Sequence, residues 1–351
     1  MTESVDFDNP KNTFVIAEAG SNWKCGSYED DLKQAKKLIK VASTSGCDAV
    51  KFQTFRSKSV YVSNAGNSDY LTKHGNNKNI NEIFTNLEMS YEMLPELSKI
   101  CKQEKIILMS TPFSVEDAKH IDDFVSIHKV ASYELNHIRL LEYLSNTNKP
   151  ILISTGASTY KQIDFTVDLF RKKNDIKIGL MQCTAKYPCP MNALNLQVIP
   201  KMITKYELPI GFSDHSLHPI IAPLVAIGLG ATFVEKHFTL DKNLFGPDHM
   251  FALNPVELKL MVDSIRNADK AKGTGIKEIL NDEKELWKFA TRSIQAIKNI
   301  SKGEILKEGY NIDILRPGNQ SKGLEPMFID KINGKKATKN YLIGEGIINS
   351  E

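Results

Sequence analysis

Short, continuously apolar runs recur between residues 13 and 239 of the chain. They cover residues 13–20, 49–55, 106–113, 125–134, 150–157, 176–183, 208–215 and 231–239. Amphipathic segments with helical spacing lie between them, as at 30–42, 92–103, 160–171 and 219–228. A parallel strand that is buried on both faces has a continuous apolar run rather than an alternating one. The pattern therefore predicts eight strand–helix units.

Two α/β architectures accommodate such units, a (β/α)8 TIM barrel and a doubly wound open sheet. Eight units fill roughly the number of residues that a (β/α)8 barrel uses. A doubly wound sheet usually has a glycine-rich phosphate turn after its first strand, and AEAGSNWKCG at 17–26 is not a GxGxxG motif. We therefore predict the TIM barrel.

The character of the sequence changes after Lys272. We predict a barrel domain over residues 1–272, a linker over 273–286 and a small β-rich domain over 287–351, where short strands, glycine turns and basic residues follow one another. About 65 residues bury only a modest core, so this domain is expected to dock on another surface. An insertion at 57–90, rich in Asn, Ser and Gly, is expected at the rim of the barrel as a substrate lid.

Composition and charge limit the kinds of molecule that this protein is expected to bind. The 351 residues are 41% hydrophobic and 25% charged with a net charge of +3, which gives no basic field for nucleic acid. The N-terminus lacks the apolar core of an export signal, and the longest apolar stretch, 220–234, is too short to span a bilayer. Five scattered cysteines fit free thiols in a reducing compartment. We expect a cytoplasmic protein without nucleic-acid or membrane partners.

Polar side chains gather where the predicted strands end, which in a barrel is the catalytic face. They are Glu18, Lys51, Gln53, Thr111, Lys129, Ser132, Glu134, Ser154, Thr155, Thr184, Ser213, His215, Lys236 and His237. Any single hydroxyl among them could be a strand-end cap. So many buried polar groups are costly unless a bound molecule pairs with them. Lysines with hydroxyl donors indicate a pocket for a small anion that carries phosphate or carboxylate.

Two histidines of this set, His215 and His237, end the seventh and eighth predicted strands, which are neighbours in a barrel. Two imidazoles with oxygen ligands and water suit an open divalent-cation site, such as one for Mn²⁺, better than a closed structural zinc site. The alternative is a core or hydrogen-bonding role for each ring. For Asp214 we favour orientation of His215 or bonding of loop amides over catalysis.

The chain resembles the sialic acid synthase family, which includes N-acetylneuraminate, legionaminic acid and pseudaminic acid synthases. The resemblance extends over nearly the full length and rests on motifs that occur in order. They are AEAGSN (17–22), DAVKFQTF (48–55), STPFS (110–114), HKVASYE (128–134), ISTGAS (153–158), CTAKYP (183–188), GFSDHS (211–216), EKHFTLDKNLFGPDH (235–249) and RPG (316–318). It implies a barrel with a C-terminal SAF (antifreeze-like) domain. The implied reaction condenses phosphoenolpyruvate with an N-acetylmannosamine-type sugar to a nine-carbon 2-keto acid and phosphate.

The resemblance also implies roles for individual residues. His215 and His237 would hold the metal, Mn²⁺ with Mg²⁺ or Co²⁺ as alternatives, and Glu18 would position or deprotonate the attacking water. The positions for phosphoenolpyruvate are Lys51, Thr111, Lys129, Ser132, Ser154 and Ser213. The positions for the sugar are Gln53, Glu134, Tyr187, Asp248 and Arg316. Arg316 matches an arginine that the SAF domain of one subunit inserts into the partner's barrel, which implies a domain-swapped homodimer.

This chain departs from the family pattern at three positions near the site. Trp23 follows Asn22 where a histidine is usual, Ala185 replaces a serine or asparagine near the phosphate, and Tyr133 replaces a smaller residue. The change at Ala185 predicts the loss of one phosphate hydrogen bond.

Several alternatives remain open from the sequence. A different phosphoenolpyruvate-dependent aldol synthase would share the barrel but not the SAF tail. A 6-phosphorylated acceptor would need a second basic cluster, for which only Lys58, Lys73 and Lys78 lie nearby. A 2,4-diacetamido-6-deoxyhexose acceptor would make the chain a legionaminic or pseudaminic acid synthase. An inactive binding protein is disfavoured, because both histidines and both lysines are present.

Overall fold

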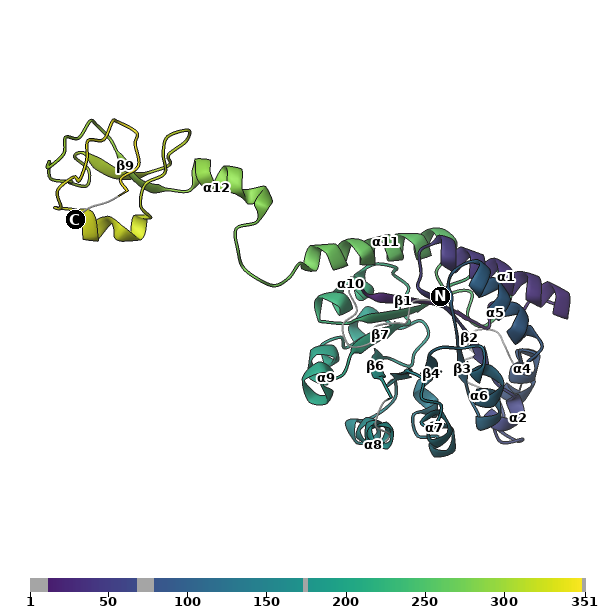
Figure 1. The fold of residues 1–351 in the computed structure, drawn as a ribbon. Coiled ribbons are helices and arrows are strands. Elements are labelled where there is room, and N and C mark those ends of the chain that lie inside the picture. Colours follow the sequence, from purple (N-terminus) through teal and green to yellow (C-terminus); the bar gives the residue numbers. More distant parts are fainter. Residues whose placement is uncertain (1–11, 68–78, 173–175, 349–351) are drawn as a thin grey trace. The chain divides into compact units, whose positions relative to one another are not determined.

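The N-terminal part of the chain folds as a closed barrel. The computed structural model describes residues 12–67, 79–172 and 176–348, and the chain divides into two compact units, Met1–Gly273 and Thr274–Glu351. In the first unit eight parallel strands close into a ring in chain order, surrounded by helices (Figure 1). The strands are β1 (Phe14–Gly20), β2 (Ala49–Thr54), β3 (Ile107–Pro112), β4 (His128–Val130), β5 (Ile151–Ser154), β6 (Ile178–Cys183), β7 (Ile210–Asp214) and β8 (Phe233–His237). The predicted TIM barrel is confirmed, because β1 pairs with β8 and closes the sheet.

Each apolar run of the sequence contains one of these strands, and helices fill the intervals. They are α1 (Tyr28–Thr44), α2 (Ser57–Val60), α4 (Ile80–Asn86), α5 (Met93–Gln103), α6 (Val115–Asp122), α7 (Ile138–Leu144), α8 (Tyr160–Arg171), α9 (Val198–Tyr206), α10 (Ile221–Gly228) and α11 (Pro255–Lys272). The short helices α2 and α4 belong to the insertion at 57–90. Its residues 68–78, with Lys73 and Lys78, lie outside the described residues.

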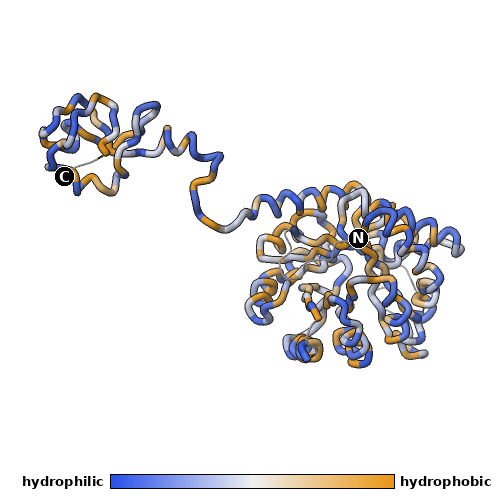
Figure 2. The backbone as a smooth tube through the Cα atoms, in the orientation of Figure 1, coloured by the Kyte–Doolittle hydropathy of each residue, from blue (hydrophilic) through white to orange (hydrophobic). Residues whose placement is uncertain are grey.

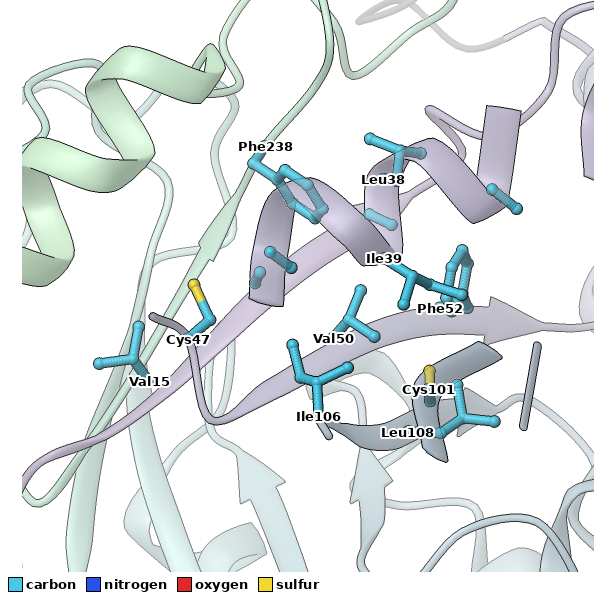
Figure 3. Close-up of a cluster of buried hydrophobic side chains, with 14 of the residues drawn as sticks. Val15, Leu38, Ile39, Cys47, Val50, Phe52, Cys101, Ile106, Leu108 and Phe238 are labelled. Atoms are coloured by element: carbon cyan, nitrogen blue, oxygen red, sulfur yellow. The ribbon is translucent and has the colours of Figure 1, made fainter. Parts of the chain in front are cut away.

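The two faces of each strand pack against different partners. One face meets the helices, as where Val50 of β2 lies beside Ile39 of α1 (Figure 3). The other face fills the lumen with a second apolar cluster: Phe14, Ile16, Ala49, Met109, Ile127, Leu152, Met181 and Phe233. Figure 2 shows apolar colouring along the strands and mixed colouring along the helices around them. Burial on both faces is the reason that the strands have no alternating pattern in the sequence.

Local capping chemistry sets where several helices begin. At the start of α1 the Ser27 hydroxyl accepts from the Asp30 amide, and the Asp30 carboxylate accepts from the Ser27 amide. Asn254 and Glu257 form the same reciprocal pair before α11, where Pro255 takes the first helical position. Each pair satisfies two amides that would lack an intrahelical partner.

The second unit is small and rich in β-structure, as predicted. It contains α12 (Lys284–Ala290), β9 (Ser293–Ala296), β10 (Ile312–Leu315) and α13 (Ile329–Ile332), and β9 pairs with β10 in an antiparallel sheet. Its core is a separate cluster that includes Ile294, Ile312 and Tyr341. In the described part of the chain, no helix is long and apolar enough to cross a membrane.

Candidate active site

The lumen becomes polar towards the carboxyl ends of the strands. Side chains alternate between the two faces of a strand, so residues two positions after the apolar lumen cluster also point into the lumen. At these positions the barrel carries a layer of buried polar side chains. They are Glu18 of β1, Lys51 of β2, Thr111 of β3, Lys129 of β4, Ser154 of β5, Ser213 of β7 and Glu235 of β8. The structure thus brings together six of the predicted site residues and adds Glu235.

Lys51 and Lys129 connect this layer through ion pairs and hydrogen bonds. The Nζ atom of Lys51 lies 2.7 Å from Glu18 Oε2, an ion pair without hydrogen-bond geometry, and donates to Thr111 Oγ1 at 3.0 Å. The Nζ atom of Lys129 donates to Ser154 Oγ at 2.6 Å. Both ammonium groups approach the same oxygen, Glu235 Oε2, at 3.7 and 3.9 Å. The two lysines therefore share one carboxylate between them.

Neighbouring opposite charges favour the ionised forms of Glu235 and Lys51 in this layer. Burial alone would raise the pKa of Glu235, but Lys129 and Lys51 outweigh it and lower that pKa to about 2. Burial likewise opposes the charge of Lys51, yet Glu18 and Glu235 raise its pKa above the usual value. For Lys129 burial dominates, and its pKa is lowered.

Glu235 is absent from the predicted site, and Lys236 was assigned to it wrongly. Glu235 stands two residues before His237, so the period-two rule places both on the lumen face, and that rule was the signal available in the sequence. Lys236 falls between them and faces the helices, with its neighbours Val234 and Phe238 in the sheet–helix core. Its Nζ pairs with Asp214 Oδ2 at 2.5 Å, both side chains being buried.

The two histidines lie together above the polar layer. Their ring centres are 5.9 Å apart, and the ring of Tyr187 lies 4.0 Å from that of His215. His215 Nδ1 is 2.9 Å from the carbonyl oxygen of Thr184, to which it donates, so the tautomer leaves Nε2 as a free base. Burial and the neighbouring His237 lower the pKa of His215 to about 3 and keep the ring neutral.

This pair of rings fits a divalent cation. His215 offers a neutral ring with an oriented second nitrogen. Nδ1 of His237 is buried without a hydrogen-bond partner in the described part of the chain and lies 3.9 Å from Asp248 Oδ2. Among residues 12–67, 79–172 and 176–348, no group of three or more His, Cys, Asp or Glu side chains is placed to hold a metal ion. A cation here would therefore take oxygen ligands from substrate or water, as in an open site.

Comparison with known proteins decides the family. The model of the NeuB family matches residues 38–277, more than half of the chain.

The chain belongs to the NeuB family.

Its NeuB-family relatives are similar over nearly their whole length. The spore coat polysaccharide biosynthesis protein SpsE of Bacillus subtilis is 38% identical over 95% of this chain and 92% of that protein. An N,N'-diacetyllegionaminic acid synthase of Campylobacter jejuni is 37% identical over 94% and 97% of the two chains. The crystal structure of an N-acetylneuraminic acid (sialic acid) synthetase from Leptospira borgpetersenii, in complex with citrate, has a TM-score of 0.69 and 30% identity over 78% of this chain and 90% of that one.

These matches confirm the predicted resemblance to the sialic acid synthases. They also confirm that the chain is an enzyme of the class that forms a carbon–carbon bond. Among the NeuB-family motifs, the Trp23 side chain that replaces a histidine packs in the sheet–helix core and is 2% exposed. Tyr133 is 63% exposed, so its ring does not fill the lumen.

Three further predicted residues, Gln53, Ser132 and Glu134, lie at or just after the ends of β2 and β4. Gln53 donates to Glu18 Oε1 at 2.9 Å, and Ser132 Oγ accepts from the Gly156 amide at 2.9 Å. Burial raises the pKa of Glu134 to about 7, and its Oε2 accepts no hydrogen bond from any residue that the structure describes.

Asp248 is held by the turn after β1. Its Oδ2 accepts from the amide and the hydroxyl of Ser21 at 3.2 and 2.9 Å. Gly20, at φ +52°, permits this approach, because a Cβ there would lie 2.7 Å from the same oxygen.

Arg316 lies in the second unit, directly after β10, and is exposed. Its insertion into the barrel of a partner subunit stays a prediction.

Proposed function

We propose that this enzyme condenses phosphoenolpyruvate with an N-acetylated hexose and water, giving a nine-carbon 2-keto sugar acid and phosphate. The observation that carries the proposal is the buried polar layer with two lysines and the hydroxyls of Thr111, Ser154 and Ser213. Ammonium and hydroxyl donors in a water-poor site bind carboxylate and phosphate strongly. The printed names of the legionaminic acid and N-acetylneuraminic acid synthases support the same reaction class.

The residues of the lumen are proposed to have different roles in the reaction, according to their positions. Lys51 and Lys129 bind the anionic groups of phosphoenolpyruvate and orient its C3 towards the aldehyde carbon, where the new bond forms. Glu18, held by Gln53 and Lys51, positions the water that adds to C2 and takes its proton. The bond from C2 to the phosphate oxygen then breaks, and phosphate leaves. His215 and His237 would hold a divalent cation, which we expect to be Mn²⁺ and which would supply Lewis acidity for the aldehyde.

For the acceptor, the following side chains are proposed to hold the sugar: Gln53, Glu134, Tyr187 and Asp248. N-acetylmannosamine is the first candidate. A 2,4-diacetamido-6-deoxyhexose is the second, and the 37% identity to the legionaminic acid synthase favours it. A 6-phosphorylated sugar would need basic side chains near its phosphate. Of the candidates Lys58, Lys73 and Lys78, only Lys58 lies among the described residues.

We further propose that the enzyme works as a homodimer in which Arg316 completes the partner's sugar site. The resemblance to the sialic acid synthase family supports this, because Arg316 of the RPG motif matches an arginine that one subunit inserts into the barrel of its partner.

The deciding experiment measures phosphate release from phosphoenolpyruvate with Mn²⁺ and each acceptor in turn: N-acetylmannosamine, its 6-phosphate, and the 2,4-diacetamido-6-deoxyhexose. We expect release with an unphosphorylated acceptor and none without a sugar. His237→Ala is expected to remain folded and lose turnover. A wild-type protein that binds Mn²⁺ and phosphoenolpyruvate but releases no phosphate with any acceptor would refute the proposed reaction.

A further inference from the structure

A buried ion pair between Lys236 and Asp214 is formed by the two residues that precede His237 and His215 in the chain. Lys236 Nζ donates to Asp214 Oδ2 at 2.5 Å and to the Ser216 carbonyl oxygen at 2.6 Å, and Ser216 Oγ lies 3.4 Å away. Asp214 Oδ1 accepts from the Ser216 amide at 2.7 Å. Asp214 and Ser216 flank His215 on both sides in the chain, and Lys236 immediately precedes His237. A single ammonium group of β8, next to His237, therefore binds the carboxylate of Asp214 and the carbonyl oxygen of Ser216, the residues before and after His215.

The position of the pair separates it from the substrate layer. Asp214 and Lys236 are register partners across β7 and β8, and each stands two residues after a member of the sheet–helix core, Phe212 or Val234. His237 instead stands two residues after Glu235, on the other face of β8. The side chains of the pair are 0% and 2% exposed, so solvent does not screen their attraction. Neither residue belongs to the lysine–carboxylate layer that is proposed to bind phosphoenolpyruvate.

Net stability does not explain such a pair. A buried ion pair contributes little over well-packed apolar residues, because desolvation of the two charges offsets their attraction. Its directional bonds do fix geometry. Here they fix the two strand ends whose imidazoles stand 5.9 Å apart, and the separation of two ligand side chains controls how well they bind one ion.

We propose that Lys236, with Asp214, is a positioning residue that sets the spacing of His215 and His237 for the divalent cation. The inference rests on the proposed metal-dependent function and adds to it a residue that touches neither substrate nor metal. The lysine acts through the backbone of both strand ends. Its loss should weaken metal binding while phosphoenolpyruvate binding is retained.

The test uses Lys236→Met in the full chain and measures Mn²⁺ binding without substrates from the electron paramagnetic resonance signal of free Mn²⁺. Removal of a residue that orients metal ligands typically weakens metal binding about 10–100-fold, and we expect a loss in that range. The affinity for phosphoenolpyruvate, titrated at saturating Mn²⁺, should change less than about twofold, as expected for a residue outside its site. Raising the Mn²⁺ concentration should restore kcat, which a general loss of structure would not allow.

Lys149→Met is the matched control. It removes the Lys149–Asp122 ion pair, 2.8 Å long, at α6 and away from the lumen, and should leave Mn²⁺ affinity unchanged. If Lys236→Met does not fold because Asp214 is left unpaired, the double variant Asp214→Asn/Lys236→Met removes both charges, and the same selective loss is expected of it.

Two results would overturn the proposal. They differ in whether they also contradict the proposed metal-dependent function. A folded Lys236 variant that binds Mn²⁺ as tightly as the wild type removes the positioning role and leaves the proposed function standing. A wild-type enzyme that releases phosphate without binding Mn²⁺ removes the metal centre and the positioning role with it.

Discussion

Two buried carboxyl groups of the same barrel, Glu134 and Glu235, have pKa values displaced in opposite directions. Burial raises the pKa of both groups, but Glu235 lies beside two ammonium groups that lower its pKa to about 2. Glu134, in the 3-10 turn after β4, is 8% exposed and forms no ion pair with the described residues, so burial raises its pKa to about 7. At neutral pH Glu235 is thus a fixed negative charge, whereas Glu134 exchanges a proton.

A pH-dependent stability follows for Glu134. The folded chain holds its proton up to about pH 7, whereas the unfolded chain releases it near the usual 4.5. This contribution to stability is complete below pH 4.5 and is lost as pH rises to 7, and it amounts to at most about 3 kcal/mol. Glu134→Gln, which cannot ionise, should gain melting temperature relative to the wild type between pH 5 and pH 8. An unchanged difference across that range would contradict the raised pKa.

At the scale of the element, the packing of β7 against β8 leaves no room for a side chain at one position of β7. Gly211 of β7 faces the lumen beside Phe233 of β8, and a Cβ at Gly211 would lie 2.6 Å from Phe233 Cβ and 2.8 Å from the Phe233 carbonyl oxygen. Both are rigid parts of the neighbouring strand, so neither can move aside without shifting β8. Ser213 and Glu235 follow on the same two strands and bond to each other at 3.1 Å.

Gly211→Ala is therefore expected to destabilise the barrel. Overpacking of this kind costs about 1–3 kcal/mol, which corresponds to a fall of roughly 3–10 °C in melting temperature. The matched control is Gly228→Ala in α10, where nothing lies within 4 Å of the added carbon and helix propensity favours alanine. A Gly211→Ala enzyme as stable as the Gly228→Ala enzyme would show that β7 and β8 adjust freely.

At the scale of the whole molecule, the proposed dimer makes each site depend on two chains. His237 lies in the barrel unit and Arg316 in the second unit, so an exchanged arrangement draws them from different subunits. Co-expression of His237→Ala with Arg316→Ala should then restore one native site per mixed dimer, about a quarter of all sites under random pairing. Activity no higher than the average of the two variants alone would contradict the exchange, because residues from one chain cannot complement in this way.

The eight strands and much of the polar rim could be predicted from the sequence because they depend on short-range patterns. A strand buried on both faces needs a continuous apolar run, and a barrel puts the polar ends of all runs at one rim. Helix α8 was predicted at 160–171, the residues that it occupies. The helices α6, α7, α9 and α11 were not among the predicted segments, although α11 extends over 18 residues.

The sequence by itself therefore determined the barrel, the small second unit and most of the side chains that line the lumen. The alternation of the eighth strand indicates the face that Glu235 and Lys236 take, but only the tertiary structure decided which groups they meet. Glu235 lies near both lysines, and Lys236 pairs with Asp214. The charge states also depend on the tertiary structure. The pKa of Glu235 is lowered by two ammonium groups that lie on other strands, and these come within 4 Å of its carboxylate only when the barrel closes.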